Sequence, residues 1–214
     1  QLLLEFFDGR TGDFEAAYSS DPEIPLIARE MVWATLNMLE YSEASVSGVS
    51  CSGGEVRDRG MAEIFNYLAD RVYPDRKIIV WAHNYHIRHL NVSTSTEGYP
   101  GCYTMGQGIA GSHRDEMYTV GLYMDRGQAA MNDRTIYTIL PGSPGTLAGY
   151  LKRGGGHPYL FLDILGLEAA DTPSWIKGTV IARSWGTNNV TMTLRDQYDG
   201  ILFIQEVSPP DYAY

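Results

Sequence analysis

No apolar run in this sequence approaches the roughly 20 residues that a membrane-spanning helix needs, and no signal-peptide pattern opens the chain. A basic charge balance is also missing. The 26 acidic residues outnumber the 16 lysines and arginines, which gives a formal net charge of -10. Because phosphate binding needs a basic face, we expect no nucleic-acid partner, and anionic membrane surfaces are disfavoured for the same reason.

Cysteine is scarce, since Cys51 and Cys102 are the only two and lack the spacing of metal ligands. They could pair in an oxidising compartment, but on so low a count we favour two reduced thiols. The sequence leaves the compartment open, with a slight preference for the cytoplasm. A Gly-x-Ser-x-Gly nucleophile elbow is absent as well, which argues against a serine hydrolase.

The overall composition is typical of an ordinary soluble globular protein, with 44% hydrophobic and 20% charged residues. A chain of 214 residues is long enough for one domain, or for a domain with an appendage. We divide it into an N-terminal helical segment and linker, residues 1–54, and an α/β domain, residues 55–214. The division follows a small and polar stretch that reads as a loop, residues 42–54.

Two amphipathic helices are predicted in the first third of the chain. The first runs over residues 24–41 and follows an Asp-Pro pair of the kind that begins helices. The second lies within residues 57–72, where apolar residues repeat at three and four positions, and Pro74 ends it. A shorter helix is expected over residues 146–152.

The central strand of the predicted fold is Ile78–Ala82, five apolar residues that follow a charged lead-in. A run of this length and composition is typical of a strand buried on both faces. Four further strands are predicted from apolar runs, and residues 91–108 are predicted to form a long loop. The four strands are residues 118–123, 135–140, 159–164 and 201–204. The first is expected to end at Asp125–Gly127. All except 135–140 are expected to be buried.

Two histidines follow the central strand directly, in the order His83-Asn84-Tyr85-His86. In open α/β sheets, ligands gather beyond the carboxyl ends of the strands, so both imidazoles are candidates for acid–base catalysis or for holding an oxyanion. The alternative is that they only satisfy loop carbonyls. A metal site on His83, His86 and either His89 or His113 is a further alternative, although a closed site needs more ligands.

Other candidate residues lie on either side of this strand. Arg57 and Asp58 are neighbours at the head of the second helix, so only one of them is expected to face the strand ends. Asp58 alone fits the simpler interpretation of an acid near the positive end of the helix dipole. Residues 104–108 are glycine-rich without the spacing of a phosphate-binding loop, and could form a lid. Three tyrosines nearby suit either an amphipathic pocket wall or a core, namely Tyr85, Tyr99 and Tyr103.

Taken together, these motifs resemble the erythromycin esterase family, which includes succinoglycan-biosynthesis-like proteins. Residues 57–62 match its Arg-Asp-x-x-Met-Ala pattern, and residues 81–86 match its Trp-Ala-His-Asn-x-His pattern. Supporting matches are Met105-Gly106, the strand at 118–123 and the closing segment 198–204. The resemblance covers about residues 25–207.

This resemblance implies an α/β fold with a mainly parallel central sheet and flanking helices, whose front half is apparently missing here. It also implies hydrolysis of a macrolide lactone or related ester by histidine-assisted water attack, without a cofactor or metal. The expected catalytic residues are His83, His86 and Arg57. The expected substrate-binding residues are Asn84, Tyr85, Tyr103 and Met105.

One part of the family pattern is absent. The family's first half carries a Gly-Glu-x-x-His segment that supplies the principal base, whereas none of the five histidines here follows a glutamate at that spacing. Apart from a small ester substrate, we therefore expect self-association or pairing with an N-terminal fragment. The alternatives to a hydrolase are a non-catalytic small-molecule-binding or complementing half-domain, and the His-ligated metalloprotein.

Overall fold

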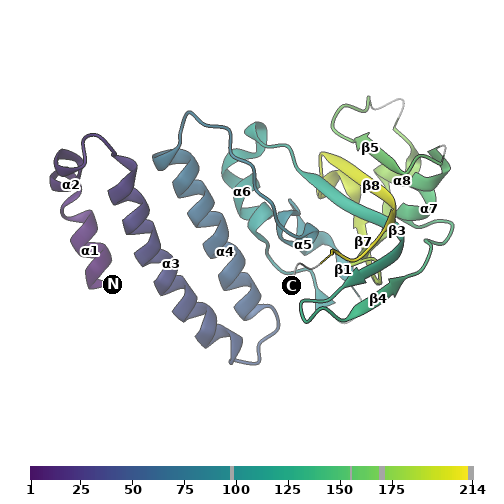
Figure 1. Cartoon of the computed structure of the whole chain (residues 1–214), viewed down its shortest axis with the longest axis horizontal. Helices are drawn as coiled ribbons and strands as arrows, with labels where there is room; N and C mark the ends of the chain where they lie inside the picture. The colour runs from purple at the N-terminus through teal and green to yellow at the C-terminus, as the bar shows by residue number, and fades with distance from the viewer. Residues whose placement is uncertain (97–98, 155, 169–171, 212–214) are drawn as a thin grey trace. The chain divides into compact units, whose positions relative to one another are not determined.

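A computed structural model describes residues 1–96, 99–154, 156–168 and 172–211 (Figure 1). Its contacts divide the chain into two compact units: unit 1 is Gln1–Ala82 with Cys102–Asp115, and unit 2 is His83–Gly101 with Glu116–Tyr214. The boundary predicted after residue 54 falls inside a helix of unit 1. The division into independently folding domains remains a prediction, because contacts alone do not measure folding.

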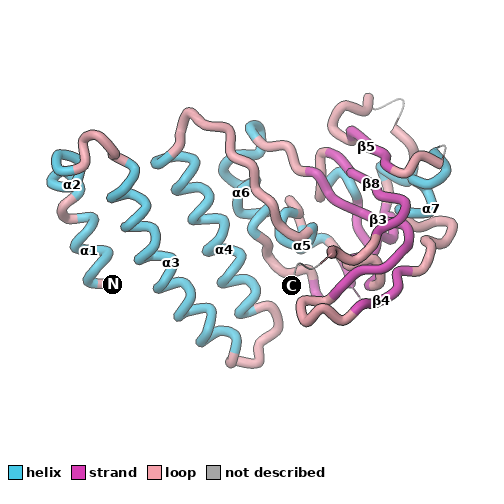
Figure 2. The backbone as a smooth tube through the Cα atoms, in the orientation of Figure 1, coloured by secondary structure: helices cyan, strands magenta, loops and turns pink. Residues whose placement is uncertain are grey.

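Unit 1 is built from helices, drawn in cyan in Figure 2. They are α1 (Leu2–Asp8), α2 (Thr11–Ala17), α3 (Glu23–Ser45), α4 (Ser52–Tyr67) and α6 (Met105–His113). The two predicted amphipathic helices are confirmed as α3 and α4, and a π-helical turn, Leu68–Val72, continues α4 up to Pro74. Among the described residues, no helix is long and apolar enough to cross a membrane.

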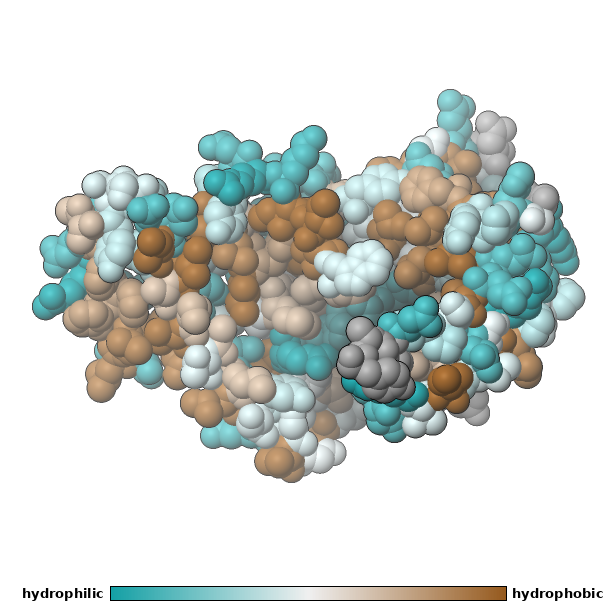
Figure 3. Space-filling view, viewed as in Figure 1, coloured by the Kyte–Doolittle hydropathy of each residue, from teal (hydrophilic) through white to brown (hydrophobic). Residues whose placement is uncertain are grey.

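Small residues let the helices of unit 1 approach closely. A side chain at Gly60 of α4 would collide with Asn37 of α3, and one at Gly108 of α6 would collide with Ala62 of α4. Apolar side chains of α1 and α3 also reach the surface, where Figure 3 shows brown atoms. The most exposed of them are Leu2, Leu3, Met31, Met38 and Leu39.

The two cysteines of unit 1 form a disulfide, so the preference for two reduced thiols was wrong. Cys51 is the residue before α4 and Cys102 precedes α6 by three positions, and their Cα atoms lie 5.7 Å apart. That distance is typical of disulfides. The packing of α4 against α6 brings the cysteines together, and their separation of 51 residues hid this from sequence reasoning.

The described residues of unit 2 form two four-stranded sheets. One has the order β2-β1-β7-β6 and is antiparallel throughout, and the other has the order β4-β3-β8-β5. The strands are β1 (Ser95–Thr96), β2 (Tyr99–Pro100), β3 (Val120–Ala130), β4 (Ile136–Ile139), β5 (Tyr159–Asp163), β6 (Thr179–Ser184), β7 (Asn188–Thr193) and β8 (Gly200–Val207). Its short α-helices are α5 (Asn84–Ile87), which precedes β1, and α7 (Leu147–Leu151) and α8 (Ser174–Lys177), which lie between strands.

The sheets correct one part of the predicted fold class. The α/β class is confirmed, but the description "mainly parallel" is wrong, because β3 with β8 is the one parallel pairing among the named strands. Strand pairs that a short turn connects, such as β6 and β7, run antiparallel because the chain reverses between them. The hairpin β6–β7 was not predicted at all.

The core of unit 2 lies among β3, β6, β7, β8 and α7. Its largest fully buried side chains include Ile201 and Phe203 of β8, which confirms the strand predicted there. Other core residues from the neighbouring elements are Tyr123, Leu147, Leu151, Val180, Ala182, Val190 and Met192. Burial of this kind contributes about 25 cal/mol per Å² of apolar surface.

Two strand predictions in unit 2 need a correction. The strand at 159–164 exists as β5, but it is not buried, because it lies at the edge of its sheet and exposes Tyr159 and Phe161. The strand at 118–123 does not stop at Asp125–Gly127 but runs through to Ala130 as β3. Gly127 makes this possible, since its φ of +126° and its close approach to Val207 exclude a side chain. The strand at 135–140 and the helix at 146–152 are confirmed as β4 and α7.

The predicted central strand, Ile78–Ala82, is wrong as a description of the folded chain. These residues are in neither a helix nor a strand, and no strand among the described residues pairs with them. Ile79 is 91% exposed and Trp81 is 90% exposed. An apolar run becomes a buried strand only where neighbouring strands and a covering layer are available, and the described residues supply neither.

Candidate functional site

His83 precedes α5 and serves as its N-cap. Its backbone is extended, with φ of -62° and ψ of 145°, and its Nδ1 accepts a hydrogen bond of 3.2 Å from the backbone N–H of Tyr85. This contact satisfies one of the donors that the first turn of a helix leaves open. The imidazole is therefore held in one orientation by the backbone that follows it.

The charge state of His83 follows from its surroundings. Partial desolvation lowers the pKa of His83 from 6.5 to about 4 although the residue is exposed, and the positive charges of His86 and Arg88 act in the same direction. The ring is therefore neutral at pH 7. Because Nδ1 accepts a hydrogen bond, the single ring proton resides on Nε2. His83 thus presents an N–H donor at Nε2.

Asn84 connects this turn to β3. Its Oδ1 accepts a hydrogen bond of 2.8 Å from the backbone N–H of Leu122, and its Nδ2 donates to the carbonyl of the same residue. The side-chain amide thus makes the pair of bonds that the peptide of a neighbouring strand would make. Asn84 was predicted to bind substrate, and the structure shows its amide engaged with β3; the substrate role remains a prediction.

Buried polar groups support the backbone of Asn84 from the other side. The hydroxyl of Tyr198 donates to the carbonyl of Asn84 at 3.3 Å, and Nε of Arg88 donates to that hydroxyl at 3.1 Å. Tyr123 adds a bond of 3.1 Å to the same oxygen, and burial raises the pKa of Tyr198 well above its usual range. Groups held in this way fix a neighbouring site in one geometry. Sequence reasoning did not single out Arg88.

A tryptophan that sequence reasoning missed lies beside His83. The centroid of the Trp185 ring is 5.7 Å from that of the imidazole, at an interplanar angle of 71°. Trp185 is in the turn of the β6–β7 hairpin, about 100 positions later in the chain. A Trp-Gly pair at the tip of a hairpin is an unusual choice of turn residues, and this signal could have drawn attention to it.

The rest of the predicted histidine block is in α5. The rings of Tyr85 and His86 meet edge to face, with centroids 5.3 Å apart, and both side chains are partly exposed. His83, Asn84, Tyr85 and His86 therefore form one short segment of unit 2. Nothing in this geometry tests the roles predicted for them.

The other predicted site residues belong to unit 1. Asp58 is fully buried and accepts a hydrogen bond of 3.1 Å from the backbone N–H of Met105, while Glu55 accepts one of 2.9 Å from that of Tyr103. Asp58 thus caps α6 and not its own helix. Nε of Arg57 lies 3.7 Å from Oδ1 of Asp58, and the side chain of Arg57 is 47% exposed. The predicted roles of Arg57, Tyr103 and Met105 remain predictions.

Two of the other histidines, His89 and His113, have structural partners. Nε2 of His89 is 2.7 Å from Oγ1 of Thr119 in a buried cluster with Asp199, and Nε2 of His113 is 3.5 Å from Oδ1 of Asp70. Within the described parts of the chain, no three His, Cys, Asp or Glu side chains gather in a way that could hold a metal ion. The described structure therefore does not assemble the set proposed for a metalloprotein. The side chain of Tyr99 lies outside the described residues.

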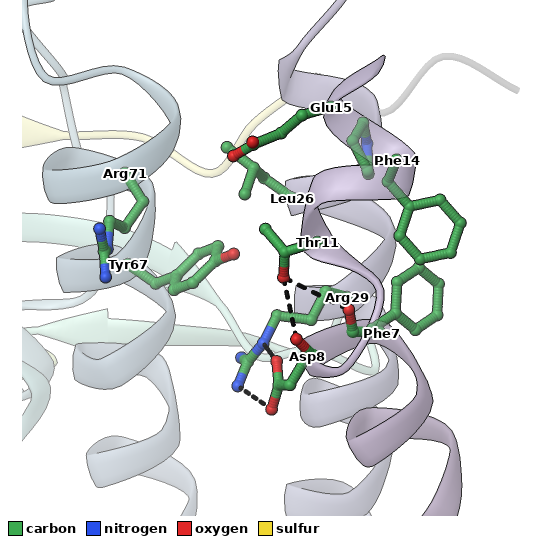
Figure 4. A pocket seen from close by; sticks show the side chains of 10 residues that line it. Phe7, Asp8, Thr11, Phe14, Glu15, Leu26, Arg29, Tyr67 and Arg71 are labelled. Atoms are coloured by element: carbon green, nitrogen blue, oxygen red, sulfur yellow. Dashed lines mark hydrogen bonds and ion pairs between the residues drawn. The ribbon is translucent and has the colours of Figure 1, made fainter. Parts of the chain in front are cut away.

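A cavity of about 510 Å³ lies among α1, α2, α3 and the end of α4 in unit 1 (Figure 4). The ion pair between Arg29 and Asp8, with 2.8 Å between Nε and Oδ1, closes one side, and Tyr67 extends toward it from α4. None of the residues predicted for catalysis or substrate binding lines this cavity. It is a feature of the helical unit in its own right.

Comparison with known proteins gives consistent matches. The erythromycin esterase family pattern matches residues 4–207. The protein named "Putative hydrolase YbfO" of Bacillus subtilis strain 168 is 31% identical over 157 residues, 72% of this chain. Two solved structures share the fold: a mutant of the erythromycin esterase EreC in its open conformation, with TM-score 0.66 and 18% identity over 95% of this chain, and a succinoglycan biosynthesis protein, with TM-score 0.63 and 16% identity over 92%.

The matches cover only part of each relative. The chain spans 35% of YbfO, 50% of EreC and 57% of the succinoglycan biosynthesis protein. At 16% and 18% identity, the solved structures support a shared fold and nothing further. The family match, in contrast, extends over nearly all of the sequence and agrees with the motifs around Arg57 and His83. The chain therefore belongs to the erythromycin esterase family.

Proposed function

We propose that this chain provides the carbonyl-polarising part of a carboxylic ester hydrolase that cleaves a macrolide lactone or related ester. The observation that carries the proposal is the state of His83. Its ring is neutral, its Nδ1 is occupied by the N–H of Tyr85, and its Nε2–H is left to donate. A neutral donor in a fixed orientation suits a carbonyl oxygen that becomes negative during the reaction.

The proposed reaction is attack of water on the ester carbonyl carbon. The electron pair of the C=O bond moves onto oxygen, where the Nε2–H of His83 stabilises the negative charge. Collapse of the tetrahedral intermediate then breaks the bond between the carbonyl carbon and the alcohol oxygen, the alcohol leaves with the proton that the base took from water, and the carboxylic acid remains. His86, in the same short segment of unit 2, is proposed to position the water. The base that removes the proton from water belongs to the Gly-Glu-x-x-His segment, which this sequence lacks.

An assay with an external base tests the proposal. Loss of the general base lowers the rate by a factor of about 10²–10⁴, so we expect slow hydrolysis of a 14-membered macrolide lactone by the chain alone. Imidazole added at increasing concentration should restore part of the rate. At each concentration, the rate with protein should exceed the rate with imidazole alone. Product formation by mass spectrometry is the measurement. A rate equal to the protein-free control at every imidazole concentration would contradict the hydrolase assignment.

A second candidate function is that of a complementing half-domain. The exposed segment Ile78–Ala82, which pairs with no described strand, favours this function. All five residues of the segment are apolar, and Ile79 and Trp81 face solvent. Exposed apolar strands recruit other strands through main-chain hydrogen bonds. The proposed occupant is a strand from the part of the family's architecture that this chain does not cover.

The chain by itself should then self-associate through this segment. We expect Ile79→Lys/Trp81→Lys to shift the protein toward monomer, because two charges disfavour an apolar contact. Light scattering coupled to size-exclusion chromatography measures the change. The matched control is Met31→Lys/Leu39→Lys, which places two lysines on exposed apolar positions of α3. Equal masses for the original chain and the first variant, or an equal shift in the control, would refute a specific role for Ile78–Ala82.

A further inference from the structure

The turn that carries Trp185 has an unfavourable backbone for that residue. Thr187 donates a hydrogen bond of 3.1 Å to the carbonyl of Ser184, and the two central residues both have positive φ, 55° for Trp185 and 76° for Gly186. Turns in which both central residues have positive φ are most often formed by Asn-Gly and Gly-Gly pairs. A bulky residue in this region is strained, and such strain persists where the surrounding structure enforces it.

Contacts beneath the turn enforce the conformation. The hydroxyl of Tyr137 on β4 donates to the carbonyl of Trp185 at 3.0 Å, and Gly186 lies so close to Ile139 that a side chain there would collide. Arg183 donates to the carbonyls of Leu140 at 2.6 Å and Asp125 at 2.7 Å. The hairpin is therefore anchored to β3 and to β4 with the residue after it, through the carbonyl of Trp185 and the side chain of Arg183.

The indole itself contributes little to that anchoring. Trp185 is 52% exposed, and the contacts that hold the turn involve its carbonyl and its neighbours. A tryptophan at this position therefore has strained backbone and exposes apolar surface. Folding stability alone would favour Asn here, because Asn tolerates positive φ and is polar. Among the residues that the structure describes, the aromatic ring that packs against the indole is that of His83.

We propose that Trp185 is a specificity-determining residue, whose exposed indole binds an apolar group attached to the ester carbonyl while His83 donates to the carbonyl oxygen. This inference rests on the proposed function, and it adds a substrate class: esters with an extended apolar body next to the carbonyl, not short acyl groups. A rigid aromatic surface held beside a polar donor is the usual composition of a small-molecule site. Both side chains belong to unit 2.

The test compares two esters and two matched amides that water does not readily cleave. The esters are phenyl octanoate and phenyl acetate, assayed with imidazole present, and the amides are N-phenyloctanamide and N-phenylacetamide, titrated by calorimetry. The variant is Trp185→Asn, which removes the indole and supplies a residue suited to the turn. Trp185→Phe retains a ring, and Leu165→Asn replaces another exposed apolar turn residue of unit 2.

In Trp185→Asn we expect the melting temperature to stay equal or rise, while the ratio of kcat/KM for octanoate to that for acetate falls about tenfold, the equivalent of about 1.4 kcal/mol. Affinity for N-phenyloctanamide should fall to a similar extent. Trp185→Phe should retain most of the preference, and Leu165→Asn should retain all of it.

The outcomes separate this inference from the proposed function. If no ester is cleaved but the octanamide affinity falls in Trp185→Asn, the inference stands and the hydrolase assignment fails. If both esters are cleaved and their ratio is the same in Trp185→Asn, the hydrolase assignment stands and the inference is overturned. Absence of any N-phenyloctanamide binding to the original chain also overturns the inference. So does a melting temperature that falls sharply in Trp185→Asn and returns in Trp185→Phe while the preference for octanoate over acetate stays the same in both variants.

Discussion

Replacing His83 with alanine should lower kcat/KM for ester hydrolysis, measured with imidazole present, by a factor of about 10²–10³. That is the effect of removing one donor from the oxyanion of an acyl-transfer reaction. The proposed donor is the Nε2–H of a neutral ring, held in place by the hydrogen bond from Tyr85 to Nδ1. Because the interaction strengthens as the carbonyl oxygen becomes negative, the loss should appear mainly in kcat.

Alanine also removes the N-cap of α5, at a cost of about 1 kcal/mol. The second variant, His83→Asp, separates the two effects, because a carboxylate can accept the hydrogen bond from Tyr85 but cannot donate to a carbonyl oxygen. We expect His83→Asp to unfold at nearly the same denaturant concentration as the original chain and to be as inactive as His83→Ala. Activity in His83→Asp close to that of the original chain would contradict a donor role.

The charge state of His83 can be measured directly. The NMR resonances of its ring protons should titrate near pH 4, whereas an unperturbed histidine titrates near 6.5. Since the unfolded chain binds this proton more tightly, acidification from pH 6.5 toward 4 should favour unfolding. The effect should be absent in His83→Ala. Solvent screening at the accessible ring keeps the contribution below that of a fully buried group.

The sequence predicted local features well and long-range pairing poorly. The helical spacing behind α3 and α4 is set within each segment, so periodicity was sufficient. The same is true of the apolar run that became β8. Ile78–Ala82 shows where this reasoning ends: its composition indicates a strand, but strand formation depends on partners that composition does not reveal.

For the candidate site, the sequence identified the histidine block but not its surroundings. His83 and Asn84 stood out because they follow an apolar run. Their supports, Arg88, Tyr198 and Trp185, come from this turn and from positions about 100 residues away. Such contacts depend on how β3, β7 and β8 pair, which no local pattern specifies. The lowered pKa of His83 likewise follows from partial desolvation and from the charges of His86 and Arg88, which the sequence does not show.

The second large effect is expected in unit 1, where removal of the disulfide should lower the free energy of unfolding. Cys51 and Cys102 close a loop with a sequence separation of 51, for which the loss of chain entropy in the unfolded state corresponds to about 3–4 kcal/mol. The double variant Cys51→Ser/Cys102→Ser tests this by denaturant unfolding monitored by circular dichroism. A difference of that size is a substantial share of the stability of a domain.

The effect should also be local. Cys51, the residue before α4, and Glu55 and Asp58 of α4 hold the start of α6 through the disulfide and the N–H groups of Tyr103 and Met105. Without the disulfide the two carboxylates remain as anchors. We therefore expect faster amide hydrogen exchange in α6 and at the start of α4, with exchange in β3 and β8 of unit 2 little changed.

The redox state supplies the control. The original chain with a reducing agent should unfold at the same denaturant concentration as Cys51→Ser/Cys102→Ser, and the double variant should not respond to the reducing agent. Identical unfolding of the oxidised chain and the double variant would contradict a stabilising disulfide. Because disulfides persist in oxidising environments, a stabilising bond between α4 and α6 would also predict that unit 1 is most stable where thiols are not kept reduced.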